Sequence, residues 1–219
     1  MYIFQPTRFL IRESIKKHGH YIKGRVLDAG SGSFTRYKQF FNFDKYLTLD
    51  FNPKFNPDIV GSVEKIPLPN SAVDSIVCTA VLGDIFNPQR PIKEFNRILK
   101  IDGSCLLTEN FFSSIHDRPL DYFRFTDYYL KKVFMENGFE IIEVEKIGGF
   151  FSLIAQAKIR YFILKFNLYQ HKILGRIFSK IFSLGSHFMI FLDKIDKSQA
   201  NRDFALGWLI IAKKIKDVK

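Results

Sequence analysis

Apolar residues are spaced along the chain in a way that predicts helices alternating with strands. Between Pro6 and His18 they recur at helical intervals, which predicts a first helix. Its inner side would carry Phe9, Leu10 and Ile15. Short apolar runs bounded by turn residues predict buried strands. These runs are RVLDAG (25–30), KYLTLD (45–50), VDSIVCTAV (73–81), SCLLTEN (104–110), EIIEVEKIG (140–148) and FALGWLIIAKKI (204–215).

Helical segments are expected between most of these strands. The segment 33–41 has the length of a helix, and a second helix should begin after the turn residues Asn87 and Pro88. A third helix is bounded by Thr126 as its N-cap and Gly138 as its C-terminal stop. This alternation predicts an α/β fold with a mainly parallel sheet and helices on both faces.

Composition is typical of a single globular unit, so we expect one domain spanning 1–219. The chain has 219 residues, of which 47% are hydrophobic and 25% charged. Cys78 and Cys105 lie inside apolar runs, which favours reduced, buried thiols and a cytoplasmic location. We find neither the features of a secretory signal nor an apolar stretch long enough to span a membrane.

The formal charge of +11 is concentrated in part in one segment. No acidic residue occurs between Glu145 and Asp193, whereas basic and aromatic residues are frequent. We interpret 149–199 as a basic, aromatic helical insert before the last strand. It would form a cap over a pocket, or a cap whose segment 158–192 also contacts an anionic membrane. Contact with nucleic acid is the third interpretation, but the apolar face is too continuous to favour it.

The turn after the first strand, in RVLDAGSGSFTRY, indicates a nucleotide-type pocket. Asp28, Gly30 and Gly32 follow a buried run at the edge where α/β sheets bind ligands. A dinucleotide fingerprint would need glycine at Thr35, and no phosphate-binding GK[ST] loop occurs. Asp50 ends the next strand about 20 residues later, where a carboxylate can accept ribose hydroxyls. The alternative is a glycine turn that only packs a helix against a strand.

An ordered series of motifs extends from Arg25 to about Gly138: VLDAGSGS, TLD, DIVGSVEKIPLPNSAVDSIVCTAVL, EFNRILKIDGSCLLTEN, DYFRFT and ENGF. The series resembles the class I S-adenosylmethionine-dependent methyltransferases, in particular a subgroup of small methyltransferase-domain proteins associated with surface-polysaccharide biosynthesis. The resemblance implies a Rossmann-like, mainly parallel seven-stranded sheet, S-adenosyl-L-methionine as cofactor and no metal.

The resemblance also implies where the cofactor would lie. The backbone of 29–32 would contact its methionine half, Asp50 its ribose, and Ser62 with Val63 its adenine. Cys78 and Val81 would close the pocket beneath the methyl group or belong to the strand core. The expected cofactor-binding residues are Asp28, Ala29, Gly30, Ser31, Gly32, Asp50, Phe51, Ser62, Val63, Cys78 and Val81.

Three departures from the family pattern bear on catalytic competence. Phe34 replaces a third glycine, Ser62 an acid that bonds the adenine amine, and the pair 83–84 reads Gly-Asp where Glu-His is common. A degenerate cofactor-binding or interaction protein with this fold is therefore an alternative hypothesis.

Candidate catalytic residues gather in the loop 110–126. Histidine has an unperturbed pKa near neutrality, so His116 is the natural general base, or simply a loop histidine. Asp121 and Arg124 are spaced to form a pair that anchors the loop. Tyr122 and the neighbouring aromatic residues would form an apolar lid or simply cover the hydrophobic core. The expected catalytic residues are His116, Asp121, Tyr122 and Arg124.

The favoured function is methyl transfer to the oxygen of a small or lipid-linked acceptor, such as a surface-glycan sugar, at the cytoplasmic side and at the inner face of the membrane. An RNA methyltransferase is a further alternative. Thr79 to Leu82 stand where a DNA amino-methyltransferase would carry an Asn-Pro-Pro-Tyr-like motif, which disfavours that class.

Overall fold

The computed structural model describes residues 2–33 and 35–218, and these form one seven-stranded sheet with the order β3-β2-β1-β4-β5-β7-β6. The first five strands run parallel, and β7 is antiparallel to both β5 and β6. The expected mainly parallel, Rossmann-like sheet is confirmed. The strands are β1 Lys23–Ala29, β2 Asn42–Asp50, β3 Ile59–Val60, β4 Val73–Thr79, β5 Leu99–Asn110, β6 Phe139–Ile147 and β7 Gly207–Lys214.

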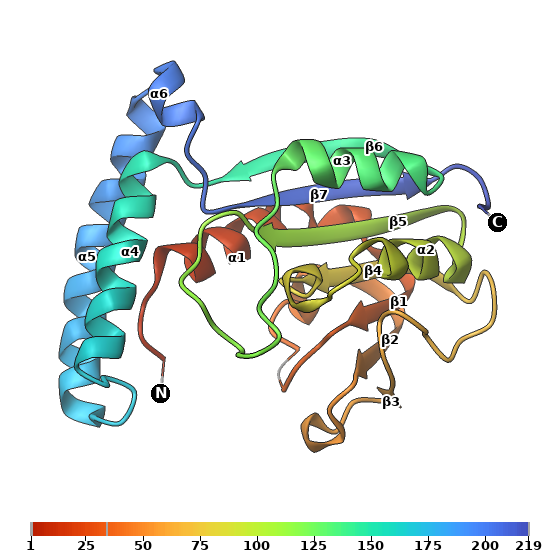
Figure 1. The fold of residues 1–219 in the computed structure, drawn as a ribbon, viewed down its shortest axis with the longest axis horizontal. Coiled ribbons are helices and arrows are strands. Elements are labelled where there is room, and N and C mark those ends of the chain that lie inside the picture. The colour runs from red at the N-terminus through yellow and green to blue at the C-terminus, as the bar shows by residue number, and fades with distance from the viewer. Residues whose placement is uncertain (1, 34, 219) are drawn as a thin grey trace.

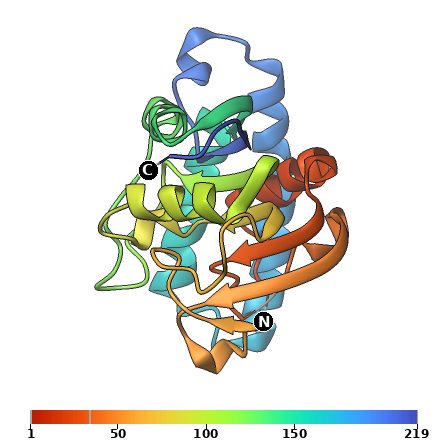
Figure 2. The ribbon, with the colours of Figure 1, turned by 90° about the vertical axis from the view of Figure 1, so that its right-hand side faces the viewer.

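Helices cover both faces of the sheet, with α2 and α3 on one face and α1 on the other (Figures 1 and 2). Figure 1 shows three more helices, α4 to α6, at the end of the sheet to which β1, β4 and β5 point. The helices are α1 Pro6–His18, α2 Gln89–Ile98, α3 Asp127–Glu136, α4 Phe150–Lys165, α5 Lys172–Ile195 and α6 Gln199–Arg202.

Two apolar layers hold this arrangement together. On one face, α2 and α3 bury residues such as Phe95 and Phe134 against the strands, and on the other α1 buries Ile15. Burying one such side chain contributes about 1.5–3 kcal/mol relative to its exposure. The helix ends follow the sequence signals: the Thr126 hydroxyl accepts from the N–H of Tyr129 at the start of α3.

One expected helix is absent. Within 33–41 the described residues form only a short 3-10 helix, Lys38–Phe40, so the prediction of a full helix was wrong. The segment is rich in residues with weak helix propensity, and Tyr37 with Phe40 instead packs against the core on the α1 side of the sheet. Phe34, which departs from the family pattern, lies outside the described residues.

The helical insert before the last strand is confirmed, since α4, α5 and α6 all lie between β6 and β7. Asp193 links α5 to the start of α4, because it accepts hydrogen bonds from the N–H groups of Phe151 and Ser152, at 2.9 and 3.0 Å. These are N–H groups of the first turn of α4, where a carboxylate is favourable. Among the described residues, none of the helices has the length and apolarity needed to cross a bilayer.

Candidate active site

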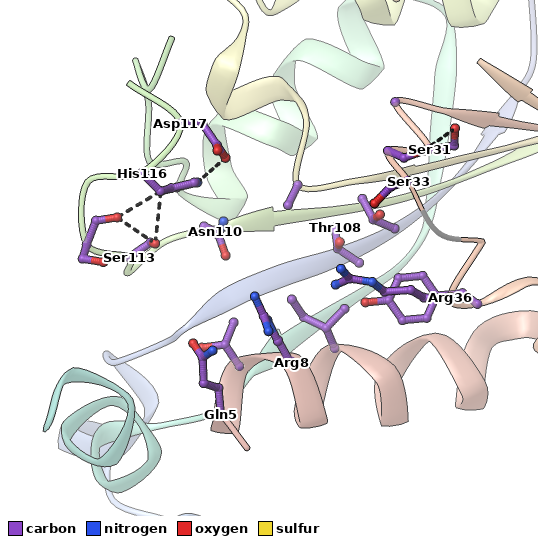
Figure 3. A pocket seen from close by; sticks show the side chains of 18 of the residues that line it. Gln5, Arg8, Ser31, Ser33, Arg36, Thr108, Asn110, Ser113, His116 and Asp117 are labelled. Carbon is purple, nitrogen blue, oxygen red and sulfur yellow. Dashed lines mark hydrogen bonds and ion pairs between the residues drawn. The ribbon is translucent and has the colours of Figure 1, made fainter. Parts of the chain in front are cut away.

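A cavity of about 490 Å³ lies at the carboxyl ends of β1, β4 and β5 (Figure 3). Small-molecule sites have volumes of about 300–1,000 Å³ and occur at this edge of α/β sheets. The turn after β1, the helix α1 and the helix α4 all contribute to its lining. The loop 111–126, which connects β5 to α3, contributes Ser113, Ser114, His116 and Asp117.

The turn after β1 is held in a conformation that suits glycine. Gly30 and Gly32 have φ values of +76° and +61°, which side chains disfavour. A Cβ atom on Gly30 would overlap Val81 Cγ2, so the glycine also permits close packing against the segment after β4. Asp50 at the end of β2 accepts hydrogen bonds from the N–H groups of Gly32 and Asn52, both at 2.9 Å. Its carboxylate therefore holds the turn in place.

Asp28 is a buried carboxyl group beside the same turn. Burial raises its pKa to about 6, although a hydrogen bond from the Tyr46 hydroxyl, at 2.7 Å, opposes the shift. Near neutral pH, Asp28 therefore offers a carboxylate that a cationic ligand group would stabilise.

The expected cofactor-binding residues divide into those that line the cavity and those that do not. The lining residues are Asp28, Gly30, Ser31 and Gly32. Thr79 and Ala80 also line it, between the expected Cys78 and Val81.

The remaining expected cofactor-binding residues lie off the cavity wall. Ala29 and Cys78 are fully buried in the core, Val81 packs against it, and Asp50 lies behind the glycine turn. Phe51 is exposed, Ser62 is bridged to Lys65, and Val63 is buried.

Among the expected catalytic residues, His116 lines the cavity. Its Nδ1 lies 3.0 Å from the carbonyl oxygen of Ser114 and 3.4 Å from Asp121 Oδ2. Because a carbonyl oxygen only accepts, Nδ1 must carry the hydrogen, which leaves Nε2 unprotonated in the neutral ring. Nε2 lies 4.0 Å from Asp117 Oδ2.

Asp121 and Arg124 form a two-point ion pair that organises this loop. The Arg124 nitrogens donate to Asp121 Oδ1 and Oδ2 at 2.6 and 2.9 Å, and Asp121 Oδ2 also accepts from the N–H of His116 at 2.9 Å. The Arg124 hydrogen bond holds the pKa of Asp121 well below its usual range. Tyr122 is exposed and lies against Phe86. None of these three expected catalytic side chains lines the cavity, and Asp121 contacts His116 both at its backbone N–H and at its ring Nδ1.

Asp84, His116 and Asp121 bring potential ligand atoms within 4.8 Å of one another. Both oxygens of Asp121 are already bonded to Arg124, so we assign no cation to this cluster.

Several cavity residues carry no sequence motif. Gln5 and Arg8 come from α1 and the residue before it, and Gln156 and Arg160 come from α4. Figure 3 shows Arg8 reaching from α1 toward β5, which carries Thr108 and Asn110. The spacing of apolar residues in α1 predicted only that this helix packs against the core. No local signal in the sequence indicates that helices so far apart along the chain meet at one cavity.

Glu109 is a further residue near the site that the sequence reasoning did not identify. It is buried at the end of β5, and its Oε1 accepts from the N–H groups of Val81 and Leu82 at 3.0 and 2.8 Å. Burial raises its pKa to about 7. Glu109 therefore fixes the segment after β4 that faces the glycine turn.

Comparison with known proteins agrees with this geometry. Residues 27–107 match the model of a family described as "Methyltransferase domain". No curated protein matches the sequence.

Solved structures share the fold at low identity. The [4+2]-cyclase SpnF is 19% identical, with a TM-score of 0.62 over 97% of this chain and 81% of its own. A SAM-dependent methyltransferase from Aquifex aeolicus is 17% identical, with a TM-score of 0.52 over 65% and 88%. Phosphoethanolamine N-methyltransferase 2 from Haemonchus contortus, solved with phosphomonomethylethanolamine and S-adenosylhomocysteine, is 11% identical, with a TM-score of 0.58 over 94% and 52%.

The match of residues 27–107 to a methyltransferase domain supports an S-adenosylmethionine-dependent methyltransferase, with S-adenosyl-L-methionine as its cofactor. The solved structures show the shared fold. The cavity fits this cofactor in kind: a glycine turn that admits close backbone approach, and a buried carboxylate that can accept from an amino group.

Proposed function

We propose that this S-adenosylmethionine-dependent methyltransferase methylates an oxygen atom of a small or lipid-linked acceptor, such as a surface-glycan sugar. The observation that carries the proposal is His116, a histidine at the cavity wall whose Nδ1 donates to Ser114 and whose Nε2 is free to accept a proton. A hydroxyl group loses a proton during methylation, and an imidazole near neutrality is suited to take it.

The residues around His116 support that role. Asp121 Oδ2 lies 3.4 Å from Nδ1, so its negative charge would stabilise the ring after it takes up a proton. When bound, the cofactor supplies an electrophilic methyl group. Gly30, Ser31 and Gly32 would hold it through the backbone, Asp28 would accept from its amino group, and Asp50 would keep the turn in shape.

The first test is isothermal titration of the purified protein with S-adenosylmethionine and S-adenosylhomocysteine. Micromolar binding, followed by transfer of a radiolabelled methyl group to a membrane or glycan fraction, would support the proposal. The His116→Gln variant should bind the cofactor but transfer at least tenfold more slowly. Saturable binding without transfer to any fraction would favour the alternative of a degenerate cofactor-binding protein.

We also propose that the segment 149–199 is a cap within a single domain spanning 1–219. Gln156 and Arg160 of α4 line the cavity, which supports this role. An RNA acceptor finds less support, because the surface of α5 presents a continuous row of apolar side chains beside its basic residues.

That exposed row is the support for peripheral membrane contact through 158–192. On α5 it comprises Ile173, Leu174, Ile177, Ile181, Leu184, Phe188, Phe191 and Ile195. Lys172, Arg176, Lys180 and Lys194 follow the same helix on the adjoining exposed side. An apolar row with a basic border is typical of helices that lie in the surface of an anionic bilayer. Phe178 and Phe182 of the same helix pack inward against Ile163 and its neighbours.

A further inference from the structure

Three arginines line the cavity, Arg8, Arg36 and Arg160, and two of them, Arg8 and Arg160, have no acidic partner among residues 2–33 and 35–218. Arg8 comes from α1 and Arg160 from α4. Arg160 Nε donates to Ser114 Oγ at 3.1 Å, and its terminal nitrogens have no partner among residues 2–33 and 35–218. Within the same described residues, Arg8 forms neither a hydrogen bond nor an ion pair.

The other charged groups of the cavity do not neutralise these arginines. Its two carboxyl groups are Asp28, which lies beside the glycine turn and accepts from Tyr46, and Asp117, which faces His116. A guanidinium group in a concave site raises the local concentration of anions and offers paired donors to a phosphate or carboxylate. Arg8 and Arg160 therefore form a cationic side of the cavity.

A second cavity, of about 930 Å³, adjoins the first at Arg8. It is lined by aromatic side chains, Tyr2, Phe4, Phe9 and Tyr37, and by polar ones, Arg8, Arg12, Thr35 and Arg36. Phe4 and Phe9 also contact His187 of α5 with ring-centroid distances of 5.2 and 4.9 Å. A cavity that combines aromatic rings with arginines suits an acceptor with an apolar chain joined to an anionic group.

We infer that the acceptor carries a phosphate-type anion, which Arg8 and Arg160 bind, and that its apolar chain lies in the second cavity. The inference rests on the proposed function and narrows its acceptor to one class. Phosphate groups occur both in lipid-linked carriers and in water-soluble metabolites, and the second cavity favours the lipid-linked source.

The test uses the protein saturated with S-adenosylhomocysteine and titrated at low salt with inorganic pyrophosphate and, separately, with farnesyl diphosphate. We expect both to bind, and farnesyl diphosphate to bind at least tenfold more tightly. Arg8→Gln and Arg160→Gln should each lower the affinity for both anions about tenfold, which is the effect of losing one charge-assisted contact. Arg202→Gln, on exposed α6, is the matched control and should change neither affinity.

The outcomes separate this inference from the proposed function. Equal affinity for the two anions would overturn the role of the second cavity. Absence of anion binding, or binding that both arginine variants retain, would overturn the inference while S-adenosylhomocysteine still bound. If the arginine variants no longer bound S-adenosylhomocysteine, the arginines would belong to the cofactor site, and the inference would also be overturned. If wild-type protein failed to bind S-adenosylhomocysteine, the proposed function itself would fail.

Discussion

The carboxylate of Asp50 accepts the N–H of Gly32 at 2.9 Å, so the end of β2 holds the turn that follows β1. The same carboxylate accepts from Asn52, and it is almost fully buried. Two neighbouring parallel strands thus share one carboxylate at the edge where the cofactor is expected. Strand register brings this about, because β1 and β2 pair over residues 23–29 and 42–49.

The Asp50→Ala variant should bind S-adenosylhomocysteine at least tenfold more weakly. Hydrogen bonds to a charged group contribute about 1.5–3 kcal/mol, and the variant loses those that shape the turn. Isothermal titration measures the effect. Asp58→Asn is the control, since Asp58 is exposed and accepts hydrogen bonds from Thr48 of the same strand, away from the turn. Equal affinities in wild type and Asp50→Ala would contradict the role assigned to Asp50.

Gly30→Ala should lower the free energy of unfolding by more than Gly32→Ala. Both substitutions place a side chain at positive φ, which costs roughly 1–2 kcal/mol. Only the Cβ on Gly30 meets another side chain, that of Val81, and overpacking costs a further 1–3 kcal/mol or so. Urea denaturation of the two variants gives the comparison. Equal losses would show that Val81 moves aside.

Glu109→Gln should make stability less dependent on pH. Burial raises the folded-state pKa of Glu109 from 4.5 to about 7, so between these values the folded state binds more protons than the unfolded state. The free energy of unfolding therefore falls as pH rises through this window, by roughly 3 kcal/mol for this group. Denaturation at pH 4.5 and pH 8 should show a smaller difference in the variant.

The raised pKa of Asp28 gives a pH dependence of the same sign, so the free energy of unfolding of Glu109→Gln will still fall somewhat as pH rises. Glu140→Gln, at an exposed position of β6, serves as the control and should keep the wild-type slope. A variant of Glu109 with an unaltered slope would mean that this carboxyl group titrates like an exposed one.

Asp121→Asn should loosen the loop that carries His116 without releasing the cofactor. The variant weakens the ion pair to Arg124 and the bond to the N–H of His116. We expect hydrogen exchange across 113–117 to become at least tenfold faster, with S-adenosylhomocysteine affinity within twofold of wild type. Asp102→Asn, which removes a surface pair with Lys213, should leave this exchange unchanged. Unchanged protection in Asp121→Asn would refute the positioning role.

Replacing Ile177 and Leu184 by glutamate should abolish binding to vesicles that contain phosphatidylglycerol. Both side chains are exposed in the apolar row of α5, and a carboxylate there is repelled by an anionic surface and costly to bury. Co-sedimentation with anionic and with neutral vesicles measures the effect. Ile101→Glu, an exposed apolar position on β5, is the control. Equal binding of wild type to both vesicle types would contradict the role of the basic border.

The alternation of strands and helices could be predicted from the sequence because each buried strand is a compact apolar run. The two-residue strand β3 is too short to give such a signal. The absent helix at 33–41 shows a second limit: aromatic residues such as Tyr37 and Phe40 match a helical length, but their packing against the sheet decides the conformation.

The site was predictable where it depends on local sequence. The glycine turn and His116 line the cavity, and both carry a recognisable local pattern. Arg8 and Arg160 are 152 positions apart, and only tertiary packing of α1 against α4 brings them to one wall. Asp50 illustrates an intermediate case, since its position was identified but its bond to Gly32 was not.

The place of β7 in the sheet constrains the order in which the chain can fold during synthesis. β7 lies between β5 and β6 and is hydrogen-bonded to both, over residues 104–110 and 139–147. Until residues 207–214 leave the ribosome, one edge of β5 has no strand partner, and β6 has none at all. A nascent chain that already contains α4 and α5 therefore exposes open strand edges together with the apolar row of α5, and this stage is the one most in need of a chaperone.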